Sequence, residues 1–185
     1  MTGAPQVDLV GHSLGGGMLP RYYLKFIPGA AAKVHTLVGL SPTNHGTTLS
    51  TMAMLADVVP ILGPGIFWMI GAVAPGLTEQ VVNSPVNVML DAGGDTVPGV
   101  DYYTIVTRYD EVSTPYGNQF LVGPRVKNQL LQENCTLDMN EHVSTLYSAR
   151  AWHYALNALD PANATPVPCY YQAPFTPFFQ KYMGK

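Results

Sequence analysis

The sequence is poor in charged residues. Asp, Glu, Lys and Arg together account for 11% of its 185 residues, against about 25% in an average soluble domain. The formal net charge is −3, and no cluster of Lys or Arg provides the concentrated positive charge that binding to nucleic acid requires. We therefore exclude a nucleic-acid partner. No grouping of residues calls for a metal ion or an organic cofactor either.

Cysteine is equally scarce. Cys135 and Cys169 are the only two, which is too few for a disulfide scaffold, and they lack the paired spacing of a zinc site. One disulfide or two free thiols remain open, and we favour the disulfide. Residues 1–5 also lack the basic stretch and apolar run of a signal peptide, so the first residues give no sign of export.

The sequence has no unbroken hydrophobic run long enough to span a membrane. Residues 58–78 carry no charge, but three prolines and four glycines interrupt them. A membrane helix needs about 20 largely apolar residues in a row. We interpret this stretch as a buried or lid-like segment and expect no transmembrane helix.

The apolar patterns predict an α/β fold. Strands are predicted where β-branched and other apolar residues gather, at residues 7–10, 34–40, 102–107 and 126–131. Apolar residues at helical spacing follow the first strand, at 18–26, and the last strand, at 143–158. Strands that alternate with helices imply a mostly parallel sheet with flanking helices.

The organisation outside these elements is simple. We expect one domain over residues 1–170. A Gly/Pro-rich apolar cap is expected as an insertion at about 46–98, where no clean period appears. Residues 171–185 complete a Pro-rich tail that we expect to be extended surface chain, attached only at Cys169.

A serine motif lies between the first strand and the first helix. Residues 11–15 read Gly-His-Ser-Leu-Gly, which matches the pattern Gly-x-Ser-x-Gly. A tight turn at this place would lift the hydroxyl of Ser13 out of the backbone, and the flanking glycines would let strand and helix approach closely. The helix N-terminus would supply N–H groups for an oxyanion. We predict that Ser13 is a nucleophile, the alternative being a serine that merely caps a helix.

A serine nucleophile needs a histidine as base and a carboxylate that orients the histidine. In this type of fold the acid and then the histidine follow the serine, each after a strand. His142 fits best, because it follows the last strand in a loop before the final helix. The side chain of His12 is expected to be packed and directed away from the Ser13 hydroxyl. His45 comes before every strand that could carry the acid, so it breaks the expected order. The other two, His35 and His153, are expected to be structural or solvated.

Asp110 is the predicted acid. It follows the strand at 102–107 and precedes His142 by 32 residues (142 − 110), which leaves room for one strand and its loops. The sequence pattern alone does not exclude its neighbour Glu111 as the acid. The other candidates are expected to serve turns or the surface: Asp8, Asp91, Asp95 and Asp101.

Several segments together resemble one family. They are the serine motif followed by Pro-Arg-Tyr-Tyr-Leu at 20–24, Ser-Pro-Thr-Asn-His-Gly-Thr-Thr at 41–48, Thr-Arg-Tyr-Asp-Glu-Val at 107–112, and Cys135 shortly before His142. These segments are similar to those of secreted triacylglycerol lipases and esterases of actinobacterial type, which are α/β-hydrolases, and the similarity runs over nearly all of residues 6–170.

The resemblance implies a role for several residues. Ser13 would be the nucleophile, Asp110 the acid and His142 the base, with the backbone N–H of Leu14 as one oxyanion donor. It also implies a bridge between Cys135 and Cys169, and a secreted protein. No cysteine lies in residues 74–82, so the second bridge that such lipases often carry in the cap is absent.

The family has a whole N-terminal half before the serine motif, whereas six residues precede the first strand here. We expect the chain to be N-terminally truncated, with the first strand left as an apolar edge and the second oxyanion donor missing. Two functions follow as hypotheses. The chain is a serine hydrolase that cleaves lipid esters through an acyl-enzyme, or it is an impaired remnant that at most binds lipid or a partner chain.

The substrate class depends on the apolar insertion. Five residues would form a hydrophobic cap that suits acyl chains: Ile66, Phe67, Trp68, Met69 and Ile70. Ordinary core packing is the other reading, and the resemblance favours a lipid or short-chain ester, with transient contact to a lipid interface.

Overall fold

The centre of the fold is a parallel sheet of four strands. The computed structural model describes residues 3–48 and 75–176 of the chain. In spatial order the strands are β1 (Val7–His12), β2 (Val34–Leu40), β3 (Asp101–Val106) and β4 (Val126–Leu130). Every neighbouring pair is parallel. The predicted α/β fold with a mostly parallel sheet is therefore confirmed, and the four strands lie where the sequence places them.

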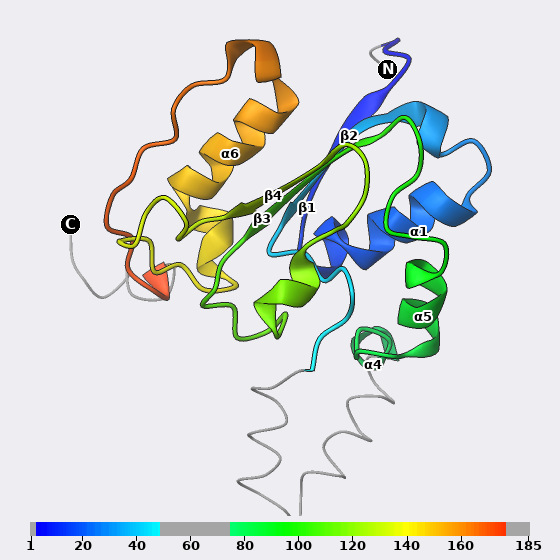
Figure 1. Ribbon diagram of the computed structural model, residues 1–185, viewed down its shortest axis with the longest axis horizontal. Coiled ribbons are helices and arrows are strands. Elements are labelled where there is room, and N and C mark those ends of the chain that lie inside the picture. The colour runs from blue at the N-terminus through cyan, green and yellow to red at the C-terminus, as the bar shows by residue number, and fades with distance from the viewer. Residues whose placement is uncertain (1–2, 49–74, 177–185) are drawn as a thin grey trace, which may run out of the picture.

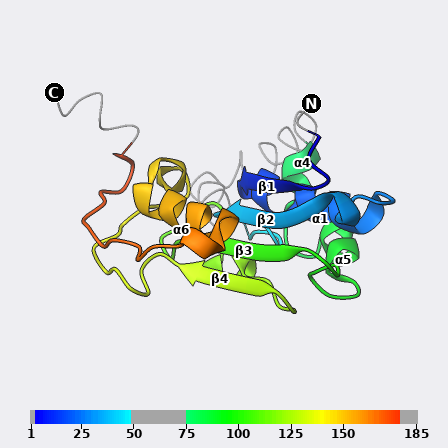
Figure 2. The ribbon, with the colours of Figure 1, turned by 90° about the horizontal axis from the view of Figure 1, so that it is seen from above.

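Helices cover both faces of the sheet (Figures 1 and 2). Helix α6 (Ala149–Leu159) lies on one face, whereas α1 (Met18–Phe26) and α5 (Pro85–Asp91) lie on the other. Alternate residues of a strand point to opposite faces. Accordingly, Val38 and Leu40 of β2 pack with α6, whereas Leu37 packs with Leu24 of α1.

Helix α1 forms where apolar residues recur at helical spacing, but only part of that stripe is buried. Met18 and Leu24 are buried. Leu19, Tyr22 and Phe26 are exposed. The helix that the sequence predicts is present, and its exposed apolar side faces away from the sheet.

Helix α6 begins later than the sequence pattern suggests. Residues 144–147 form a separate 3₁₀ turn, and the hydroxyl of Ser148 accepts a hydrogen bond from the N–H of Ala151 at 3.1 Å, which caps the helix. Tyr147, which we expected on the buried stripe, is 62% exposed. Ala151 and Ala155 are fully buried, so small side chains bring α6 close to the sheet.

A helix also lies inside the region that we expected to have no regular pattern. Helix α5 starts directly after Ser84, whose hydroxyl accepts a hydrogen bond from the N–H of Asn87 at 3.2 Å. Pro85 occupies the first helical turn, where its fixed φ is favourable. The Ser-Pro pair was the sequence signal for this helix. The other short elements are α4 (Pro75–Thr78) and the 3₁₀ turns η1 (Ser13–Gly16), η2 (Ala31–Lys33), η3 (Tyr116–Gln119), η4 (Ser144–Tyr147) and η5 (Pro161–Asn163).

The segment after α6 runs back along the loop that follows β4. A disulfide joins Cys135 and Cys169, which confirms the expected pairing. The attachment is more extensive than we expected, because the backbone of Gln172 exchanges hydrogen bonds with Leu137 and Met139. None of the described helices has the length and apolar character that crossing a membrane requires.

Strand β1 forms one edge of the sheet within the described residues. Val7 and Val10 on this strand are 52% and 40% exposed. The apolar edge that we expected at this strand is therefore present.

We expect the disulfide to make a large contribution to stability. Its two cysteines are 34 residues apart, and closing a loop of that size is worth up to about 4 kcal/mol in the chain-entropy model. Replacing both cysteines by serine should lower the free energy of unfolding by up to this amount, as measured by urea denaturation. The wild type under reducing conditions is the control and should match the double variant. Equal stability of the oxidised and reduced wild type would contradict this expectation.

Candidate active site

The chain makes a sharp turn between β1 and α1, and we call residues 11–17 the elbow. Strand β1 ends at His12, and the 3₁₀ turn η1 carries Ser13 at its first position. Ser13 has a φ of 55°, a left-handed conformation that residues other than glycine rarely adopt and that often marks a functional site. The turn leaves Ser13 partly exposed. This is the geometry that a strand–serine–helix nucleophile turn requires.

Three glycines of the elbow have no room for a Cβ, and only Gly11 among them belongs to the sequence motif. A Cβ on Gly17 would lie 2.2 Å from the carbonyl oxygen of Thr43. A Cβ on Gly11 would lie 1.9 Å from the carbonyl oxygen of Gly15, and a Cβ on Gly16 would lie 2.4 Å from that of Gly11. Gly16 also approaches Gly39 of β2. A Cβ on Gly15, by contrast, would meet no atom within 4 Å. Our expectation that both flanking glycines allow close approach is therefore correct for Gly11 and wrong for Gly15, whose place is taken by Gly16.

The loop after β2 is hydrogen-bonded through Thr43 to the elbow and to the start of α1. The N–H of Thr43 donates to the carbonyl of Ser13 at 3.0 Å, and the carbonyl of Thr43 accepts from the N–H of Met18 at 2.9 Å. Thr43 is buried. The turn at Ser13 and the start of α1 are thus fixed to the same residue.

Asp110 and His142 form a buried pair, although 32 residues separate them in the chain. The Nδ1 atom of His142 lies 2.8 and 3.0 Å from the two carboxylate oxygens of Asp110. The Asp110 carboxylate also accepts hydrogen bonds from the N–H groups of Val112 and Ser113. The exposed fractions of the His142 and Asp110 side chains are 5% and 0%. Asp110 is therefore held in place from two sides and can orient one tautomer of the histidine.

Glu111, the alternative acid, takes a different position. Its Oε2 accepts a hydrogen bond from the backbone N–H of His142 at 3.2 Å, whereas the Nδ1 atom of the His142 ring contacts the carboxylate of Asp110. Burial raises the pKa of Glu111 above its usual range. The structure thus brings both acidic neighbours to the same histidine, one to its ring and one to its backbone.

His12 reaches His142 from the elbow, which sequence reasoning missed. Its Nε2 lies 2.9 Å from the carbonyl oxygen of His142, so this nitrogen carries the proton and donates. The two imidazole rings are tilted, with centroids 4.6 Å apart. Burial lowers the pKa of His12. Among the described residues no hydrogen bond joins the Ser13 hydroxyl to His142, so His12, which directly precedes Ser13, is the link between the elbow and the histidine.

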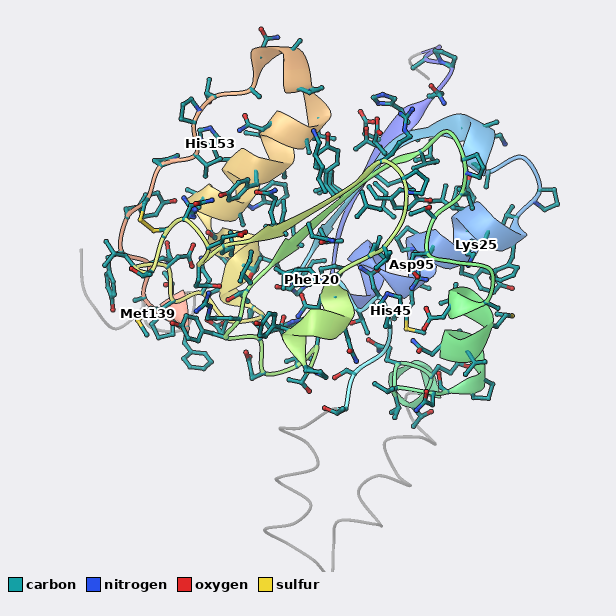
Figure 3. The ribbon with its side chains drawn as sticks, viewed as in Figure 1. Lys25, His45, Asp95, Phe120, Met139 and His153 are labelled. Atoms are coloured by element: carbon teal, nitrogen blue, oxygen red, sulfur yellow. A yellow bond between two sulfur atoms is a disulfide. The ribbon has the colours of Figure 1, made fainter. Side chains whose placement is uncertain are left out.

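His45 belongs to a separate cluster. Its Nδ1 lies 2.8 Å from Asp91. Its Nε2 lies 3.3 Å from Asp95, and these two residues are labelled in Figure 3. The hydrogen bond to Asp95 raises the pKa of His45 above its usual value. Burial alone would raise the pKa of Asp95, but hydrogen bonds from His45 and from the backbone of Val122 lower it. Asp91 and Asp95 are therefore partners of this cluster and not the simple turn residues that we expected.

Arg21 of α1 supplies the positive charge of this cluster. Its guanidinium is buried and lies 3.0 Å from Asp91 and 3.4 Å from Asp95. The ligand atoms of His45, Asp91 and Asp95 lie within 4.8 Å of one another, a spacing at which they could hold a metal ion. Since the guanidinium already contacts both carboxylates, we interpret the group as an ion-pair cluster. Lys25, one turn further along α1, donates to the carbonyl of Leu90 in the last turn of α5 and to those of Ala92 and Gly94 just after the helix.

The remaining histidines lie away from His142. His35 pairs with Asp8 on the sheet edge at 3.0 Å. His153 on α6 contacts the hydroxyl of Thr165 at 2.8 Å. Neither contacts the elbow, as expected for structural or solvated side chains.

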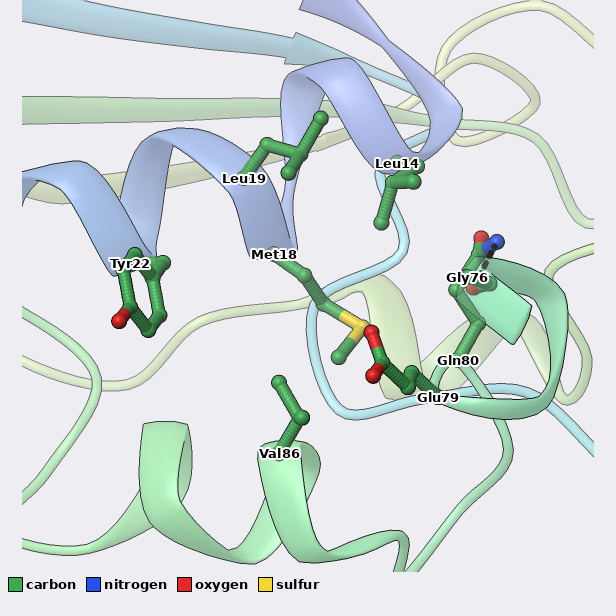
Figure 4. A pocket seen from close by; sticks show the side chains of 8 residues that line it. All are labelled: Leu14, Met18, Leu19, Tyr22, Gly76, Glu79, Gln80 and Val86. Carbon is green, nitrogen blue, oxygen red and sulfur yellow. Dashed lines mark hydrogen bonds between the residues drawn. The ribbon is translucent and has the colours of Figure 1, made fainter. Parts of the chain in front are cut away.

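A cavity opens beside the elbow. Its volume is about 400 Å³, and it lies between the start of α1 and the α4–α5 segment (Figure 4). Its walls are mostly apolar, with one carboxylate and one amide: Leu14, Met18, Leu19, Tyr22, Gly76, Glu79, Gln80 and Val86. Leu14 directly follows Ser13, so the cavity begins next to the serine. The five acyl-binding candidates at 66–70 lie outside the described residues.

Comparison with known proteins supports the fold. No protein-family model matches the chain, and no curated protein matches it in sequence. Among solved structures, the chain is similar to lipase B of Aspergillus fumigatus, with a TM-score of 0.64 and 22% sequence identity. The alignment covers 88% of this chain and 38% of the lipase, so the chain spans well under half of that protein's length. At this identity the likeness shows a lipase-like α/β fold.

The glycine geometry leads to a paired prediction. Gly16→Ala should lower the free energy of unfolding by about 3 kcal/mol or abolish folding, because the new methyl group would meet backbone atoms that cannot move aside. Gly15→Ala should change stability by less than about 0.5 kcal/mol, since its methyl group would point into open space. Thermal and urea unfolding of both variants measures the difference. Equal effects would show that the elbow is not limited by this close approach.

The His45 cluster predicts a pH-dependent stability. Because the pKa of His45 is raised in the folded state, its contribution is complete below the unfolded value of 6.5 and is lost as the pH rises through the folded pKa. His45→Gln should therefore cost about 1–3 kcal/mol at about pH 5.5 and less at about pH 9. His35→Gln, at a histidine whose side chain is 48% exposed, is the control and should cost little at either pH. A loss for His45→Gln that does not change with pH would contradict the assignment.

Proposed function

We propose that the chain is a serine hydrolase that cleaves carboxylic esters of lipids. The observation that carries this proposal is the buried Asp110–His142 pair, which a hydrogen bond from His12 joins to the turn that holds Ser13 in the left-handed conformation. A general base that is oriented by a carboxylate and placed near a raised serine hydroxyl is the arrangement that acyl transfer needs. The lipase-like fold of the chain supports the same chemistry.

The proposed reaction proceeds in two halves. The Oγ atom of Ser13 attacks the ester carbonyl carbon while the Nε2 atom of His142 takes its proton, and the N–H of Leu14 donates to the oxyanion. His142 then gives the proton to the leaving alcohol, which leaves an acyl group on Ser13. Water attacks this acyl-enzyme with the same histidine as base, and the carboxylic acid departs. Asp110 holds the ring and stabilises its charged form throughout.

The cavity supports an ester with an apolar chain. Leu14, Met18 and Val86 give it an apolar lining that begins next to the serine, and such surfaces favour hydrocarbon. The motifs at residues 11–15, 41–48 and 107–112 support a relation to secreted lipases and esterases of actinobacterial type. The disulfide supports a protein that folds in an oxidising compartment.

The nucleophile can be tested directly. A fluorophosphonate probe should label Ser13, and Ser13→Ala should remove both the labelling and the release of nitrophenol from acyl esters. Asp110→Asn and His142→Ala should each reduce turnover by about 10³-fold or more, because the three residues act as a unit. Asp160→Asn and His153→Ala, which replace the same residue types away from the elbow, are the controls and should keep the wild-type rate.

Two results would contradict the proposal. Labelling that persists in Ser13→Ala would place the nucleophile elsewhere. Wild-type chain that binds an acyl ester in the cavity but neither hydrolyses it nor reacts with the probe would instead support a lipid-binding role without turnover.

A further inference from the structure

His142 lies on a segment with little regular structure of its own. The loop between β4 and η4 carries it, outside any helix or strand. The backbone of such a loop is fixed by the side chains that bind its peptide groups. The contact with Asp110 involves the histidine ring alone, and a ring held at one nitrogen can still move when its backbone shifts. The position of Nε2 therefore depends on what holds the backbone of residue 142.

Two side chains hold the peptide groups of His142 itself. Glu111 accepts a hydrogen bond from its N–H at 3.2 Å. His12 donates to its carbonyl oxygen at 2.9 Å. The ring, the N–H and the C=O of one residue are thus bound by three different side chains, and these come from the β1 end and the loop after β3. No two of these contacts constrain the same group.

We infer that His12 and Glu111 are positioning residues for His142: they fix its backbone, and His12 ties that backbone to the turn that carries Ser13. This inference rests on the proposed function. His12 is the residue next to Ser13, so its hydrogen bond sets the distance between the nucleophile's turn and the base. Among the described residues, no hydrogen bond joins Ser13 directly to His142. The hydrogen bond of His12 therefore sets the distance over which the proton moves from Ser13 to His142.

The chemistry of His12 suits this place. During acyl transfer the ring of His142 becomes positively charged, with the His12 ring 4.6 Å away. Burial lowers the pKa of His12, so at neutral pH its ring is neutral and does not oppose that charge. Its Nε2–H still donates. A lysine or arginine would donate as well, but would place a second positive charge beside the base.

The test compares side chains that keep or lose the hydrogen bond. His12→Phe keeps a ring of similar size but loses the donor, whereas His12→Gln supplies a neutral N–H donor. Misplacing a catalytic group by about 1 Å costs up to about 10²-fold in rate. His12→Phe should therefore lower kcat by about 10–100-fold with KM within about twofold, and His12→Gln should restore kcat to within about fivefold of the wild type.

The same comparison applies to Glu111. Glu111→Gln keeps an oxygen that accepts from the N–H of His142 and should be mild, whereas Glu111→Leu should lower kcat by about tenfold or more with little change in KM. His153→Phe on α6 is the control for the ring substitution and should change nothing. Equal kcat values for the Phe and Gln variants at position 12, or a loss that appears in KM alone, would overturn the inference for His12.

A spectroscopic readout separates this inference from the proposed function. The Nδ1 proton of His142, held between the ring and Asp110, should give a low-field NMR resonance that is protected from exchange with water. We expect the resonance in the wild type and in His12→Gln, and its broadening or loss in His12→Phe with the fold intact by circular dichroism. This result requires no turnover, so it stands even if Ser13 fails the probe test. A resonance unchanged in folded His12→Phe would overturn the inference.

Discussion

At the end of β1 the backbone folds back so closely on itself that no side chain fits between Gly11 and Gly16. This close approach turns the chain from the sheet into α1 within a few residues and places Ser13 in a left-handed conformation at the apex. The direction of α1, the exposure of the serine and the position of the cavity all follow from this turn. Thr43 then fixes the turn from the neighbouring loop.

The parallel arrangement of the strands explains why distant residues meet at this turn. The carboxyl ends of parallel strands lie along one edge of a sheet, and ligand sites gather there. His12 ends β1, Thr43 follows β2, and Asp110 follows β3, while His142 follows β4 on the way to α6. Each strand therefore delivers one part of the candidate site, and the contacts between those parts are made by side chains that are distant in sequence.

The sequence predicted those features that depend on local pattern. The four strands, the serine turn and the start of α1 follow from short-range apolar spacing, and the order of acid and histidine led to Asp110 and His142. The features that the sequence did not predict depend on contacts between residues that are distant in the chain. The hydrogen bond from His12 to the carbonyl of His142 joins residues 130 positions apart in the chain. Glycine is needed at position 16 because a Cβ there would clash with the backbone of Gly11. Helix α5 was missed for another reason: it is seven residues long and lies among glycines and prolines, so only its Ser-Pro start marked it.

Arg21 and Lys25 fasten α5 to α1 by donating to carbonyls at the C-terminal end of α5. Their positive charges also offset the negative end of the helix dipole. The fastening lies at one end of α5, whereas Val86, which lines the cavity, lies at the other. An evolving chain can therefore alter the width of the cavity by substitutions in the first turn of α5 while its anchor remains in place. The width of the cavity and the geometry of the serine turn are in this way open to separate selection.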